Sequence, residues 1–237
     1  MSSTTSTTPT STSTTSTHWR RQGGPPLLVP VLAFAVLTVA SGALGASAPR
    51  PDTSAAHVLT YDTAHTTVMT VAAAVLFGST IPLVICAATL YRKLRRLGVA
   101  APGPLMGFAG GILAAASLAA SALFTWTAAQ TAQLGDPALA RALTTLSFAT
   151  GATGFVVPFG LLLAGIAVPA LILRLLPRAL AWAGLVIAAL ALLSTFAMLT
   201  PALYPLLPIG RFGGVLFLIA VAALLPSQAH RQPTARP

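Results

Sequence analysis

The sequence predicts an all-α protein: a transmembrane bundle of six helices with both chain termini in the cytoplasm. Of the 237 residues, 55% are apolar and only 7% are charged, whereas a soluble domain carries about 25% charged residues. The apolar residues gather in long runs, and the basic residues fall mainly on one side of those runs. This composition argues against a soluble enzyme, a disulfide scaffold and a disordered protein.

Six apolar runs approach the roughly 20 residues that a helix needs to cross a hydrocarbon core. Backbone groups in lipid have no water to bond, so these runs must be helices, and they lack the alternation of barrel strands. The predicted helices run from Leu27 to Ala46, Val68 to Tyr91, Leu105 to Ala129, Ala149 to Leu173, Ala179 to Thr200 and Ile209 to Leu225.

These helices form one membrane domain over residues 27–226, between cytoplasmic tails at residues 1–26 and 227–237. Of the first 17 residues, 15 are Ser or Thr. Such a tract buries too little apolar surface to offset the entropy of ordering it, so we expect it to be disordered.

The positions of the charges predict the orientation. With the N-terminus inside, ten of the 13 basic residues fall on the cytoplasmic side, and only Arg50, Arg141 and Arg211 fall outside. The three acidic residues also fall outside: Asp52, Asp62 and Asp136. A positive-inside bias sets orientation in a bilayer, so the net charge of +10 reflects topology and predicts no nucleic-acid partner.

The first helix has a second interpretation. Arg20-Arg21, the apolar stretch and Ala46-Ser47-Ala48 together resemble a secretory signal with a small-residue cleavage site. The stretch exceeds the 7–15 residues usual for a signal, which favours an uncleaved helix. Cleavage would leave five helices in the same orientation.

Small residues and prolines mark the third and fourth predicted helices. Gly107, Gly111, Ala115 and Ala119 recur at four-residue spacing, which lets two helix backbones approach closely in lipid. Pro158 lies within the fourth helix and removes a backbone donor there. Packing of the third helix against the fourth, with a bend, is the simpler interpretation, and a gating hinge at Pro158 is the alternative.

The segment between the first two helices offers the one candidate metal site. If it is helical, His57, Tyr61 and His65 share one face, with Asp62 beside them. Two imidazoles and a carboxylate can ligate zinc or another transition metal. The spacing matches no strong metal motif, however, and favours ordinary surface histidines, so we predict no metal or other cofactor.

Arg211 stands between apolar sequences on both sides. From Phe212 to Leu225 a helix would span only ~21 Å, so the sixth helix must include Arg211, thin the bilayer or begin in a re-entrant segment. A charge near hydrocarbon is costly and is usually paired. An arginine reaching the outer headgroups is the favoured interpretation, and an ion pair or ligand site with Asp62 or Asp136 is the alternative.

Hydroxyl and amide side chains gather at the predicted outer ends of the helices. They either bond back to their own helix carbonyls or line a shallow polar vestibule. The residues are Thr66, Thr67, Thr70, Thr125, Thr127, Gln130, Gln133, Thr144, Thr145, Ser147, Thr150, Thr153, Ser194, Thr195 and Thr200.

The segments Phe148 to Gly165, Leu175 to Leu185 and Gly210 to Ala220 carry a family resemblance. Over roughly Val68 to Pro226 the chain resembles uncharacterised multi-pass membrane proteins of actinobacteria. The resemblance implies a bacterial cytoplasmic (inner) membrane, and it brings no activity and no functional residues.

No catalytic pattern appears in the sequence: no nucleotide-binding glycine loop, no Ser/His/Asp set and no acidic residue within a predicted helix. We therefore expect a non-enzymatic membrane protein, structural or sensory, that acts in the lipid bilayer as a homo-oligomer or with a membrane protein partner. The alternative is a small uncoupled permease or a carrier of lipids or solutes that uses the polar vestibule.

Overall fold

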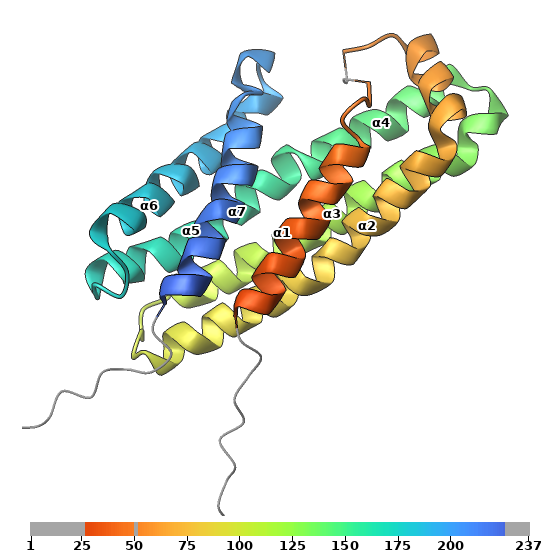
Figure 1. The fold of residues 1–237 in the computed structure, drawn as a ribbon. Coiled ribbons are helices and arrows are strands. Elements are labelled where there is room, and N and C mark those ends of the chain that lie inside the picture. Colours follow the sequence, from red (N-terminus) through yellow and green to blue (C-terminus); the bar gives the residue numbers. More distant parts are fainter. Residues whose placement is uncertain (1–26, 50–51, 226–237) are drawn as a thin grey trace, which may run out of the picture.

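The computed structural model describes residues 27–49 and 52–225, and they form a bundle of helices aligned along one axis (Figure 1). The predicted tails at 1–26 and 227–237 lie outside the described residues. The helices are α1 (Leu28–Leu44), α2 (Ala55–Arg96), α3 (Gly103–Thr131), α4 (Pro137–Gly151), α5 (Thr153–Ile172), α6 (Arg178–Leu193) and α7 (Leu206–Leu224). Short 3₁₀ segments cover Ala132–Leu134, Ser194–Met198 and Pro201–Leu203.

The all-α prediction is confirmed, and α4 and α5 together make the predicted fourth helix. That element begins at Pro137, twelve residues before its predicted start, because Asp136 caps it: Asp136 Oδ1 accepts hydrogen bonds from the backbone N–H of Ala138 and Leu139. The helix breaks at Ala152, where φ is −96° and ψ is −95°.

Five helical segments are long and apolar enough to cross a membrane, and α1 is a shorter apolar helix of 17 residues. The predicted sixth helix begins three residues early, at Leu206, so that Arg211 lies inside α7. Including Arg211 lengthens the apolar helix to 19 residues, about 28 Å, which removes the mismatch that the sequence raised.

α2 differs most from its prediction. The expected loop around His57 and Asp62 is helical, and α2 runs for 42 residues with one irregular residue, His65, at φ −120° and ψ 20°. A helix of that length spans about 63 Å, twice a hydrocarbon core. The apolar part, residues 68–91, is long enough to cross a membrane, and residues 55–67 extend the helix beyond it toward the end predicted to be outside.

The close packing predicted for the third helix is confirmed. A Cβ at Gly110 would lie 2.6 Å from the Pro158 carbonyl oxygen, and one at Gly165 would lie 2.6 Å from the Gly107 Cα. α3 and α5 therefore touch backbone to backbone, as small residues allow in lipid. Gly111 instead faces Ala87 of α2, so α3 packs tightly between α2 and α5.

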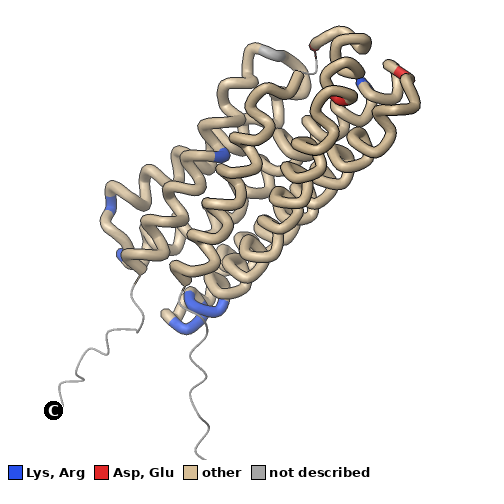
Figure 2. Tube along the Cα trace, turned by 45° about the vertical axis from the view of Figure 1, so that its right-hand side comes forward, with Lys and Arg blue, Asp and Glu red and all other residues tan. Residues whose placement is uncertain are grey.

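The two ends of the bundle carry different charges (Figure 2). The three aspartates lie near one end, and the basic run at residues 92–96 lies at the other. At that basic end, Lys93 Nζ donates a 2.8 Å hydrogen bond to the Leu225 carbonyl, just beyond α7. This bond ties the last turn of α2 to the last turn of α7.

Candidate functional site

Two adjoining cavities open in the half of the bundle that carries the aspartates. The Asp62 cavity, of about 190 Å³, lies between α2, α3, α4 and the end of α1. The Arg211 cavity, of about 370 Å³, lies between α1, α4, α5 and α7. Gly45, Ser147 and Phe148 line both, so the two form one elongated site.

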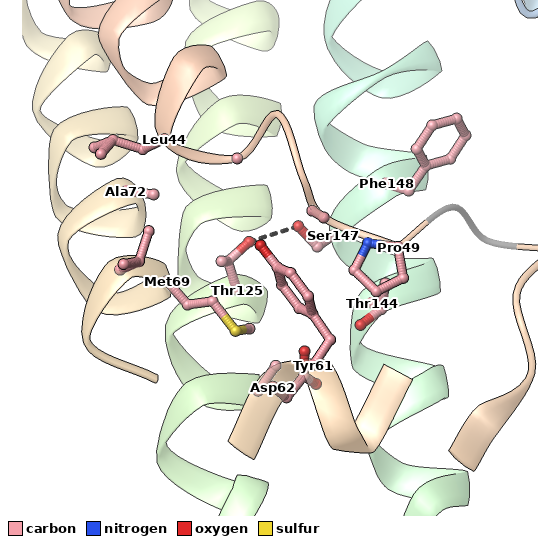
Figure 3. A pocket seen from close by; sticks show the side chains of 14 residues that line it. Leu44, Pro49, Tyr61, Asp62, Met69, Ala72, Thr125, Thr144, Ser147 and Phe148 are labelled. Atoms are coloured by element: carbon pink, nitrogen blue, oxygen red, sulfur yellow. Dashed lines mark hydrogen bonds between the residues drawn. The ribbon is translucent and has the colours of Figure 1, made fainter. Parts of the chain in front are cut away.

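Tyr61 and Asp62 lie at one end of the Asp62 cavity, and Phe148 lies at the other (Figure 3). The Tyr61 hydroxyl shares a 3.0 Å hydrogen bond with the Ser47 hydroxyl, which ties the segment after α1 to α2. The Asp62 side chain is buried, and its Oδ2 has no hydrogen-bond partner among the described residues. Burial raises the pKa of this carboxyl to about 6, from the ordinary 3.8.

A cluster of hydroxyls joins α3 to α4 where the two cavities meet. Ser121 Oγ donates to the Ser147 carbonyl at 2.8 Å, and Ser147 Oγ donates to the Ser121 carbonyl at 3.1 Å. Thr125 Oγ1 lies 2.7 Å from Ser147 Oγ (Figure 3). These reciprocal bonds satisfy polar groups that would be costly to bury alone and fix this wall of the site.

The Arg211 cavity holds a half-buried cation among apolar side chains. The Arg211 guanidinium carbon lies 5.3 Å from the centre of the Phe155 ring, a cation–π distance. Its Nε is shielded from solvent and has no hydrogen-bond partner among the described residues. Phe148, Val156, Leu207 and Phe212 supply apolar walls.

The candidate ion pair between Arg211 and Asp62 or Asp136 is not formed at the Arg211 Nε atom. Asp136 instead caps α4. Asp62 lines the neighbouring cavity, and Asp62 Oδ2 and Arg211 Nε are both without hydrogen-bond partners. Arg211 interacts with an aromatic ring rather than with a carboxylate, which sequence reasoning missed because Phe155 is 56 positions away.

The candidate metal ligands are placed in different surroundings. His57 is exposed, whereas His65 stacks on Tyr61 with ring centres 4.2 Å apart. His65 Nδ1 also lies 3.0 Å from the Tyr61 carbonyl oxygen, which accepts. Among the described residues, no three His, Cys, Asp or Glu side chains group in a way that could hold a metal ion.

Of the two interpretations of the hydroxyl side chains, bonding to helix carbonyls accounts for most of them, and the cavities have chiefly apolar walls. Most of the threonines donate to backbone carbonyls three or four residues earlier in the chain, among them Thr66, Thr70, Thr127, Thr145, Thr150 and Thr195. Thr125, Thr144 and Ser147 are the ones that line the Asp62 cavity. Hydroxyls that bond to the preceding turn need no cavity to satisfy them.

The bend in the fourth predicted helix lies away from the proposed hinge. α5 continues as a helix through Pro158, and the non-helical backbone is at Ala152, which lines the Arg211 cavity. Pro158 instead packs its carbonyl against Gly110 of α3. The break in helical backbone in this segment therefore lies at Ala152, six residues before Pro158.

The surface of the bundle agrees with a lipid environment. Large apolar side chains face outward along it, including Val36 at 65%, Leu216 at 67% and Ile172 at 73% exposure. In water such a surface would be unstable, but in a bilayer it is the expected lipid contact. Together with five apolar helices of membrane-spanning length, it defines the chain as a multi-pass helical membrane protein. Comparisons with family models, curated proteins and solved structures find no match.

Proposed function

We propose that the chain is a non-enzymatic protein of the bacterial cytoplasmic membrane that binds a small amphipathic ligand at its outer end and has a sensory role. The observation that carries this proposal is the Arg211 cavity with the adjoining Asp62 cavity. Ligand sites are typically clefts of about 300–1,000 Å³ with apolar walls and a few placed polar groups. The Arg211 cavity, at about 370 Å³, fits that description.

The packing of the opposite half favours binding over conduction. Leu83, Cys86 and Leu90 of α2 are at most 1% exposed, and so are Ala167 and Ala170 of α5. These described side chains of α2 and α5 are closely packed in that half of the bundle. A ligand entering from the outer end would stop there, as in a receptor.

An uncoupled carrier is the second candidate, and the break at Ala152 favours it. Ala152 joins α4 to α5 and lines the Arg211 cavity. A bend at that joint would move α4 relative to α5 and change the access to the cavity. The two candidates share the binding site and differ in whether the ligand crosses.

Filling the cavity tests the proposal. Gly42 lines the Arg211 cavity, and a Cβ built there meets nothing within 4 Å. The Cβ of Gly42→Phe therefore meets no clash, and the ring should narrow the cavity. Gly78→Phe is the matched control, because a Cβ at Gly78 of α2 also meets nothing within 4 Å and Gly78 lines neither cavity.

Thermal unfolding in nanodiscs is measured with decanoate, decanol and decylamine as probes. A molecule that binds only the folded protein raises its apparent stability. We expect at least one probe to stabilise the native chain and Gly78→Phe but not Gly42→Phe. Equal responses of all three proteins would refute a ligand site in this cavity. Passage of the stabilising probe across proteoliposomes would select the carrier over the receptor.

A further inference from the structure

In the Arg211 cavity, one buried N–H donor has no hydrogen-bond acceptor among the described residues. An arginine offers five N–H donors and has no acceptor of its own. A buried donor without a partner costs about 1–3 kcal/mol, and more when it is charged. The Phe155 ring stabilises the charge of Arg211 but accepts no N–H bond in the guanidinium plane, so the Nε donor stays unmatched.

None of the three aspartates, all of them among the described residues, accepts a hydrogen bond from Arg211 Nε. Asp136 Oδ1 is engaged by the backbone at the start of α4, and Asp52 is exposed. Asp62 lines the neighbouring cavity with its own oxygen unmatched. An acidic side chain lines that neighbouring cavity and a basic side chain lines this one, so a negative ligand group is favoured beside Arg211 rather than beside Asp62.

The start of α7 adds a second attraction for a negative charge. Leu207 and Pro208, in the first turn of α7, line the cavity. This helix end has neither a side-chain cap nor an acidic residue in its first turn. No side chain therefore compensates the positive end of the α7 dipole, and helix N-termini favour anions.

The walls determine what else the ligand must carry. Leu76, Phe148, Val156 and Phe212 surround the cation with apolar surface. A small hydrated anion would lose its water there without gaining matching contacts. An acid group joined to an apolar tail would satisfy both the guanidinium and the walls.

We infer that the Arg211 cavity binds the acid headgroup of an anionic amphiphile, with the headgroup on Arg211 and the tail along the apolar walls. This inference rests on the proposed function and names the ligand class of the same site. The acid group is a carboxylate or a phosphate ester, and it comes either from a free fatty acid or from a membrane phospholipid.

The test compares probes that differ in one property, with the full chain in phosphatidylcholine nanodiscs. Decanoate and decanol share a tail and differ in charge, and inorganic phosphate carries charge without a tail. Phosphatidylglycerol retained through purification from mixed lipid is counted by mass spectrometry. The variants are Arg211→Gln and Arg211→Lys, with Arg141→Gln as the control because Arg141 is exposed on α4.

We expect decanoate to bind the native chain and Arg141→Gln at least about tenfold more tightly than decanol, since charge-assisted hydrogen bonds have that size. Arg211→Gln should abolish the preference, and Arg211→Lys should keep part of it and so exclude misfolding as the cause. Phosphatidylglycerol retained by the native chain and lost in Arg211→Gln would support the phospholipid source.

Three results would overturn the inference. Equal affinity for decanol and decanoate would show a ligand site that ignores charge, which leaves the proposed function intact. Binding of inorganic phosphate as tight as that of decanoate would show an anion site without a tail. Binding of no probe by any variant would refute both the inference and the proposed function.

Discussion

Replacing Gly165 by alanine tests the contact that holds the bundle together. The added Cβ would lie 2.6 Å from the carbonyl oxygen of Gly103 and 2.6 Å from the backbone of Gly107. Those atoms belong to the backbone of α3, so no side chain can rotate away. α3 and α5 must separate, and overpacking of this kind costs about 1–3 kcal/mol.

A clash with backbone atoms belongs to the upper part of that range, about 2–3 kcal/mol. Alanine gains about 1 kcal/mol over glycine within a helix, so the net loss for Gly165→Ala is about 1–2 kcal/mol. For a chain of this size, 1 kcal/mol shifts the Tm by about 2–4 °C. We therefore expect the apparent Tm in detergent to fall by about 2–8 °C.

The control is Gly78→Ala, which receives the same side chain on a helix where a Cβ meets nothing within 4 Å. Its Tm should stay level or rise. If both substitutions shift the Tm equally, the close approach of α3 and α5 does not stabilise the bundle, and the reasoning from small-residue spacing fails.

Three further predictions concern single polar groups. Because burial raises the pKa of Asp62 to about 6, the folded state binds a proton more readily than the unfolded state. Stability should therefore rise by up to about 1 kcal/mol as the pH falls from 7.5 to 5, and Asp62→Asn should remove that dependence in thermal unfolding. Lys93→Met removes the hydrogen bond to the carbonyl just beyond α7 and should speed hydrogen exchange in the last turn of α7, whereas Arg92→Met, at an exposed position, should not. Ser147→Ala breaks the reciprocal bonds between α3 and α4 and should cost about 1–3 kcal/mol. Thr145→Ala removes only a bond within one helix and should leave the Tm within about 2 °C.

The presence of the helices could be predicted because a backbone surrounded by lipid must satisfy its own hydrogen bonds. The apolar runs also lack the alternation of barrel strands. The third helix was placed within two residues at each end, from Gly103 to Thr131. The predicted first residues of α2 and of the α4–α5 element were wrong, because the polar sequence at the start of each helix was interpreted as a loop. Polar turns of a helix carry no hydropathy signal. The start of α4 is instead marked by the Asp136 cap, which the structure shows.

The site was predicted only in part. Sequence reasoning singled out Arg211 as a costly charge, with Asp62 and Asp136 as candidate partners and an arginine reaching the outer headgroups as the other interpretation. The structure places Arg211 and Asp62 in two adjoining cavities, and Phe155 takes the place of the carboxylate beside Arg211. An aromatic partner in another helix depends on how the helices cross, which no spacing within one helix reports.

By itself, the sequence determined that the chain is a helical membrane protein, because its scarcity of charge and its apolar runs permit no other stable arrangement. It also determined which helix presents a surface of small residues. The tertiary structure alone decided that the half of the bundle carrying the aspartates holds the Asp62 and Arg211 cavities. Such a cavity is the space left after helices distant in sequence have packed. The physical reason is that hydropathy is a property of each segment, whereas empty space belongs to the bundle.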